Sequence, residues 1–177
     1  MAKRDAWPQS VVTPRVRVIS DNDYSGDPDG LVQLAHHLLS PSVEVLGVIG
    51  TLMDASGWGD PAEDHVGSAV DKARKVAKLC NRKEVRIVRG ADHALRDHHT
   101  PIATDGVRMI IDAAMADDPR PLYVVCGASL TEVASAWLIE PRIADRLTVV
   151  WIGGHEYEGF PVPAGIADME YNLGIDR

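Results

Sequence analysis

Hydrophobic and polar positions follow one another in blocks along this chain. Short, nearly continuous runs of Val, Ile and Leu are separated by longer stretches in which apolar residues recur at the spacing of one helix face. A short run that is apolar throughout is typical of a strand buried on both faces, and the longer spacing is typical of an amphipathic helix. The short runs predict five strands, over residues 15–20, 43–50, 85–89, 122–126 and 147–152.

The longer stretches predict four helices, over residues 28–39, 63–79, 102–115 and 130–139. Pro28 at the start and Pro41 beyond the end bracket the first of them, as helix geometry favours. At the start of the fourth, Thr131 and Glu132 are expected to serve as capping residues. Alternation of strand and helix predicts a mostly parallel sheet with right-handed crossovers and helices on both faces. We therefore expect a single Rossmann-like α/β domain over residues 1–177.

Ligands of open α/β sheets bind beyond the carboxyl ends of the strands. Polar, acidic and glycine-rich segments follow four of the predicted strands in this chain. These segments are residues 21–29, 51–59, 127–129 and 153–172. We expect the functional site to be built from them.

The first of these segments is strongly acidic. Asp21, Asp23, Asp27 and Asp29 fall within nine positions. Carboxylates this close together repel one another unless a positive group lies between them, and a hard cation such as Ca²⁺ or Mg²⁺ takes several carboxylate oxygens at once. The segment therefore predicts a divalent-cation site.

The acidic segment also allows other interpretations. Helix capping explains Asp27 and Asp29 but neither of the earlier two. An EF-hand loop requires Glu at its twelfth position, where this chain has Val32, and is excluded. A Mg²⁺-dependent phosphohydrolase of the haloacid dehalogenase type would use Asp21 as nucleophile and Asp23 as acid/base, and this alternative stays open.

Composition limits the kinds of partner that the protein is expected to bind and the cellular compartment in which it is expected. The formal net charge of the 177-residue chain is -8, which argues against a nucleic-acid partner. Cys80 and Cys126 are its only cysteines and are expected to be reduced core residues. Neither a signal-peptide core nor an apolar run of about 20 residues is found, so we expect a cytoplasmic protein without a membrane partner.

Five segments in order resemble the inosine-uridine-preferring nucleoside hydrolases. The acidic segment is similar to that family's Asp-Thr-Asp-Pro-Gly-x-Asp-Asp motif with one extra residue. Residues 38–48 are similar to the segment around the family's second strand. Residues 125–134 are similar to its Gly-Pro-Leu-Thr-Asn-x-Ala segment, and residues 151–154 to its Met-Gly-Gly turn. Residues 167–176 are similar to its Ala-Glu-Phe-Asn-x-x-x-Asp segment.

The resemblance implies Ca²⁺-assisted hydrolysis of an N-glycosidic bond, giving ribose and a free base. It implies that Asp23, Asp29 and the Gly127 carbonyl bind the metal. Asp23 would also be the catalytic base that takes a proton from the attacking water. Glu170 and Asn172 would bind the ribose hydroxyls, and the substrate would be a small-molecule nucleoside.

Two departures from the family pattern concern substrate binding. Pro28 replaces the first Asp of the family's pair; either Asp27 takes over its contact with ribose or that contact is lost. Asp54 or Ser56 could replace an Asn that follows the family's second strand, with a solvated turn as the alternative. His155, after the glycine turn, lies where it could contact base or ribose, with a structural role as the alternative.

Family members continue for a comparable span beyond the equivalent of Arg177. The chain is therefore expected to be truncated at the C-terminus and to correspond to the N-terminal portion of such a domain. The resemblance also implies a homo-oligomer. Whether this portion alone is active stays open, and an inactive nucleoside- or sugar-binding remnant is the further alternative.

Overall fold

The computed structural model describes residues 12–26, 28–52 and 64–152. Within them, five strands form one sheet in the order β3-β2-β1-β4-β5, and every neighbouring pair is parallel. The strands are β1 (Val16–Asn22), β2 (Val43–Gly50), β3 (Ile87–Arg89), β4 (Leu122–Cys126) and β5 (Thr148–Trp151). The predicted Rossmann-like α/β fold is confirmed.

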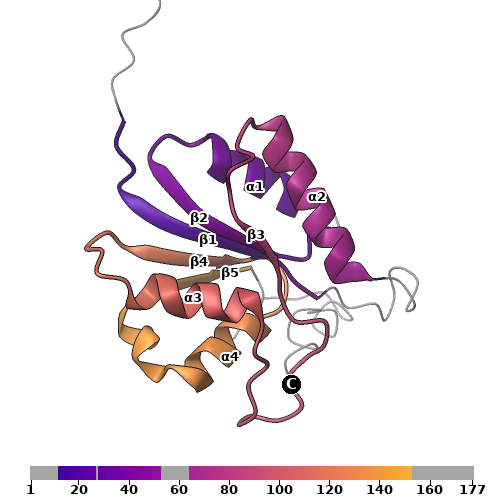
Figure 1. Ribbon diagram of the computed structural model, residues 1–177, viewed down its shortest axis with the longest axis vertical. Coiled ribbons are helices and arrows are strands. Elements are labelled where there is room, and N and C mark those ends of the chain that lie inside the picture. The colour runs from indigo at the N-terminus through magenta and orange to yellow at the C-terminus, as the bar shows by residue number, and fades with distance from the viewer. Residues whose placement is uncertain (1–11, 27, 53–63, 153–177) are drawn as a thin grey trace, which may run out of the picture.

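In the described part of the chain, four α-helices cover the sheet in two layers (Figure 1). The helices are α1 (Asp29–Leu39), α2 (His65–Leu79), α3 (Asp105–Met115) and α4 (Thr131–Ile139), and a short 3₁₀ helix η1 (Pro141–Asp145) follows α4. The layer of α1 and α2 packs Leu34 and Leu38 against one face of the sheet. On the other face, the layer of α3 and α4 packs Ile110 against Ile19 and Val124.

Element boundaries differ from prediction by a few residues, for identifiable reasons. The second and third helices begin at His65 and Asp105 because the side chains of Asp64 and Thr104 accept hydrogen bonds from the first-turn N–H groups of Gly67 and Val107. The first strand extends two residues further than its apolar run.

The chain adds strands first on one side of β1 and then on the other, so the strand order reverses between β1 and β4. From β1 the chain runs outward through β2 to β3, and it then returns to add β4 and β5 on the other side. Such a reversal leaves a crevice beyond the strand ends, because the connections from the two central strands lead to opposite faces of the sheet. The segments after β1 and β4 therefore meet where a ligand is expected.

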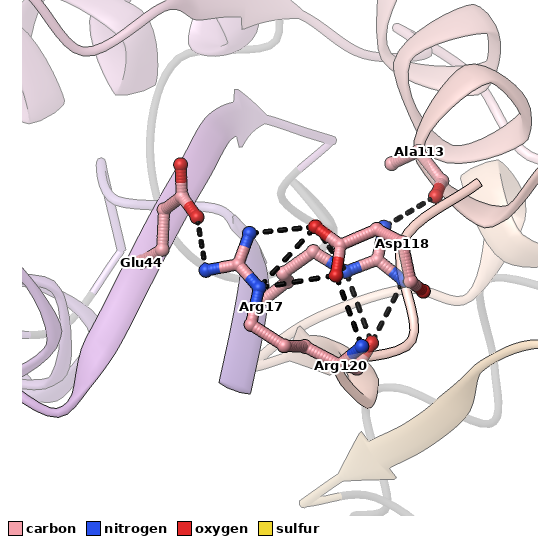
Figure 2. Close-up of polar contacts among 5 residues, drawn as sticks. All are labelled: Arg17, Glu44, Ala113, Asp118 and Arg120. Carbon is pink, nitrogen blue, oxygen red and sulfur yellow. Dashed lines mark hydrogen bonds and ion pairs between the residues drawn. The ribbon is translucent and has the colours of Figure 1, made fainter. Parts of the chain in front are cut away.

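A buried arginine ties the amino-terminal end of the sheet to the turn before β4 (Figure 2). Arg17 is 4% exposed and donates to the carbonyls of Ala113, Asp118 and Arg120. Its Nε lies 3.7 Å from the Asp118 carboxylate. Arg120 in turn bridges Asp118 to Glu44 of β2, at 2.6 Å from each. Hydrogen bonding to Arg120 holds the pKa of Asp118 well below its usual range.

The edge of the sheet formed by β5 carries exposed apolar side chains. Val149 and Val150 of β5 are 38% and 45% exposed, unlike the strands that lie between two neighbours. The expectation that this strand is buried on both faces is therefore wrong. Homo-oligomerisation, which an open apolar edge would favour, stays a prediction.

Both cysteines are reduced, as predicted, with Cys126 buried and Cys80 half-buried. Over the described residues, no helix has the length and apolar character needed to cross a membrane.

Replacing Arg17 by Met should lower the free energy of unfolding by about 3 kcal/mol, because buried carbonyls lose their donor and Asp118 loses one of its cations. Urea denaturation checks this. Arg142→Met is the control, because the Arg142 ion pair with Glu140 is exposed and its loss should change stability little. Equal stabilities of the two variants would contradict the role given to Arg17.

Candidate functional site

The last two residues of β1 point to opposite faces of the sheet. Asp21 pairs in register with Ile49 and Cys126, both of which belong to the core beneath α3 and α4, so its side chain faces that layer. It is 0% exposed. Strand pairing continues through Asp21 and Asn22, so Asp21 belongs to the sheet and not to the loop that follows it.

The acidic loop therefore begins at Asp23, which is half-buried just beyond the sheet. A tight turn follows, in which the Gly26 N–H donates to the Asp23 carbonyl at 2.8 Å. A Cβ on Gly26 would lie 2.7 Å from Oδ2 of Asp23, so the carboxylate lies against this glycine and would have to shift for any larger residue. The Asp23 carboxylate is thus held at the carboxyl end of the central strand.

Asp29 is exposed and opens α1. The N-cap residue is Pro28, without a side-chain capping bond, and the alternative that Asp27 caps this helix lies outside the described residues. A carboxylate in the first turn is stabilised by the helix dipole, as expected for Asp29.

The middle of the acidic loop is anchored on α2. Tyr24 is fully buried, and its hydroxyl donates to Oγ of Ser20 at 2.8 Å. Burial raises the pKa of this phenol far above its ordinary value of 10.0. Ser25 donates to the His65 carbonyl at 3.2 Å, and Lys72 donates to the Ser25 carbonyl at 3.1 Å. The sequence pattern gave no role to these residues, because their contacts to α2 involve partners distant in the chain.

Gly127 follows β4 directly and lies beside the end of β1. Its N–H donates to the Asp21 carbonyl at 2.9 Å. The side chain of Asn22 packs against both Gly127 and Gly30, leaving no room for a Cβ on either. The structure therefore brings together the segments that carry Asp23, Asp29 and Gly127.

Glu132 lies in the first turn of α4 and is fully buried. Its carboxylate accepts from the Thr51 hydroxyl after β2, at 2.9 Å, and from the Ala91 N–H after β3. The N-cap of α4 is Leu130 and has no side-chain capping bond, so the capping role predicted for Thr131 and Glu132 is wrong. Glu132 instead connects the loops that follow two neighbouring strands.

An exposed ion pair fixes the start of α2 beside the end of β3. Asp64 accepts from both terminal nitrogens of Arg89, at 2.8 and 2.7 Å. Hydrogen bonds from Arg89, and then from the Gly67 N–H, lower the pKa of Asp64 from 3.8 to about 2.

Asp23, Asp29 and the Gly127 carbonyl stay predicted metal ligands. Carboxylate and carbonyl oxygens are the ligand types that Ca²⁺ prefers. No group of three or more His, Cys, Asp or Glu side chains gathers in the described part of the chain.

The predicted substrate-binding residues are not among those that the structure describes. Asp27, Asp54, His155, Glu170 and Asn172 lie outside the described residues, and their roles stay predictions.

Full burial of Asp21 counts against the phosphohydrolase alternative. A nucleophile must reach its substrate, whereas this carboxylate is 0% exposed within a strand paired on both sides.

Glu132→Leu should lower the free energy of unfolding by about 1–3 kcal/mol, because the Thr51 hydroxyl and the Ala91 N–H would be buried without an acceptor. Glu132→Gln keeps a carbonyl oxygen of the same reach and should cost less. Urea denaturation of both variants checks this. A Leu variant as stable as wild type would contradict the connecting role.

Asp64→Asn should remove an acid-sensitive part of the stability while keeping the helix cap, since Asn also caps. The folded pKa of Asp64 lies below its usual value, so the Arg89 pair stabilises above about pH 4 and the benefit is lost as pH falls through about 2. Unfolding free energies of wild type and variant, measured at low salt from about pH 6 to 2, should therefore converge on acidification. A constant difference across that range would show that the pair contributes nothing to the pH dependence.

Two known proteins are similar to this chain in sequence. No family model matches the chain. It is 29% identical to the "Inosine-uridine preferring nucleoside hydrolase" of Leishmania major, over 90% of this chain and 54% of that protein. It is 38% identical over 71 residues to the protein of the same name from Crithidia fasciculata, covering 40% of this chain and 21% of that one. The chain thus spans about half the length of the Leishmania relative.

Solved structures agree on the fold. The inosine-uridine preferring nucleoside hydrolase from Bacillus anthracis superposes with a TM-score of 0.60 at 18% identity, over 79% of this chain and 51% of that one. The predicted resemblance to the inosine-uridine-preferring nucleoside hydrolases is confirmed, and the chain has the nucleoside hydrolase fold over about half the length of those proteins.

Proposed function

We propose that the protein to which this chain belongs is a nucleoside N-ribohydrolase that uses Ca²⁺ to hydrolyse the N-glycosidic bond, releasing ribose and a free base. One observation carries the proposal. The segments bearing Asp23, Asp29 and Gly127 meet at the β1/β4 reversal of a sheet that matches nucleoside hydrolases, and the family resemblance assigns the metal ligands to these residues. The sequence similarity to two inosine-uridine-preferring enzymes supports the same activity.

Each residue has a distinct proposed task. Asp23, Asp29 and the Gly127 carbonyl hold the cation, and Asp23 accepts a proton from the attacking water. A calcium ion bound there would lower the pKa of water and orient it. Cleavage of the bond to the base leaves positive charge on the sugar, which the nearby carboxylates stabilise. Asp27, Asp54, His155, Glu170 and Asn172 complete the proposal as substrate-binding residues.

Calcium binding is tested by thermal melts of this chain in EDTA, Ca²⁺ or Mg²⁺. A ligand that binds only the folded state stabilises by RT ln(1 + [L]/Kd), so Ca²⁺ should raise the melting temperature. Asp29→Asn should lose most of that rise. Asp71→Asn is the matched control, because the same change there falls on the exposed surface of α2 and should leave the rise intact. A rise with Mg²⁺ alone would favour the phosphohydrolase instead.

Hydrolysis is tested with inosine and uridine, following release of free base and reducing sugar. Asp23→Asn should lower kcat by about 10²–10⁴-fold, as expected on loss of a general base. Calcium binding without turnover, in a longer chain that restores the span found in the relatives, would favour the nucleoside-binding remnant. Release of phosphate from a phosphoester without any cleavage of nucleosides would contradict the proposal.

A further inference from the structure

We propose that Asn22 is a positioning residue that sets the placement of the three segments carrying Asp23, Asp29 and Gly127. The inference rests on the proposed function, since those three residues are the proposed calcium ligands. Asn22 itself is not among the ligands. Its contribution would be to hold them at the spacing that the ion requires.

The position of Asn22 leaves its amide little freedom. It is the last residue of β1 and is 3% exposed. Its backbone carbonyl accepts from the Thr51 N–H at 3.1 Å, which keeps it in the sheet. A buried amide must find hydrogen-bond partners, because an unpaired one loses its hydration without compensation.

Both ends of the Asn22 amide find such partners. The Asp23 N–H donates to Oδ1 at 2.8 Å, and Nδ2 donates to Oε1 of Gln33 on α1 at 3.3 Å. An N–H group can only donate, so the atom facing Asp23 must be the oxygen, and this fixes the orientation of the whole amide. One side chain thus joins the first residue of the acidic loop to the helix that begins with Asp29.

Packing adds the third segment. A Cβ on Gly30, the neighbour of Asp29, would lie 2.6 Å from Nδ2 of Asn22. A Cβ on Gly127 would overlap the same nitrogen more severely. The flat amide therefore fills the space between the first turn of α1 and the segment after β4. Its thickness sets how closely Asp29 and the Gly127 carbonyl approach one another.

Asn22→Leu tests this, because leucine has a similar volume but is not flat and cannot accept from the Asp23 N–H. Calcium affinity of the folded chain is measured by isothermal titration calorimetry, and the melting temperature is measured separately in EDTA. We expect the Kd for Ca²⁺ to rise about 10–100-fold, the range typical for residues that support metal ligands. Asn22→Asp keeps a flat group and the acceptor for the Asp23 N–H but loses the donor to Gln33, so its calcium affinity should lie between those of the wild type and the leucine variant.

Arg17→Met is the matched control, since it destabilises the opposite end of the same strand. It should lower the melting temperature in EDTA and leave the Kd for Ca²⁺ unchanged. This separates positioning from stability, because a purely structural role of Asn22 would also move only the melting temperature.

Gly127→Ala tests the same contact from the other side and serves if Asn22→Leu does not fold. Its added methyl group meets the Asn22 amide and should also weaken calcium binding. Unchanged affinity in either variant would overturn the inference alone, as would an Asp variant as weak as the Leu variant. A wild-type chain that does not bind calcium would overturn the proposed metal site and, with it, this inference.

Discussion

The central strand β1 is hydrogen-bonded on both sides, and this constraint determines the rest of the site. A strand paired on both edges can direct its side chains only to one helical layer or the other. The side chain of Asp21 therefore points into the core beneath α3 and α4, and that of Asn22 points toward α1. Asp23 is the first acidic residue beyond the sheet and can face a ligand. Asp21 and Asp23 look equivalent in the sequence, and the pairing of one strand separates them.

The two ends of the sheet are stabilised by different kinds of contact. At the amino-terminal end, Arg17 is surrounded by carbonyls and one carboxylate, so its charge is satisfied inside the protein. At the carboxyl end, the polar side chains connect loops to one another. Glu132 joins the segments after β2 and β3, and Asn22 joins the segment after β1 to α1. A rigid base and connected loops are what a site of fixed geometry requires.

Much of the fold could be predicted because it follows local pattern. The bounds of β2 and β4 agree with the apolar runs that predicted them, and all four helices lie where the helical spacing indicated. The extension of β1 through Asp21 and Asn22 could not be predicted, since both are polar and only the pairing with β2 and β4 keeps them in the strand. The order of helices and strands can thus be predicted from the sequence. The residue at which each one ends depends on contacts with residues that are distant in the chain.

The same division applies to the site. Acidic and glycine-rich segments after strands predict a site at the carboxyl edge of the sheet, because parallel strands place their carboxyl ends together. The structure brings the segments that carry Asp23, Asp29 and Gly127 together there. The partners of Glu132 are 41 and 81 residues away, so its local position at a helix start suggested capping instead. The role of Asn22 was equally hidden, since the contacts that define it involve Gln33 of α1 and the glycine after β4.

A crystal structure of the chain grown with calcium would locate the metal directly. We expect one ion at the β1/β4 reversal, with oxygens of Asp23, Asp29 and the Gly127 carbonyl at about 2.3–2.6 Å. Calcium bound elsewhere, with these three groups contacting only water or protein, would contradict the proposed site.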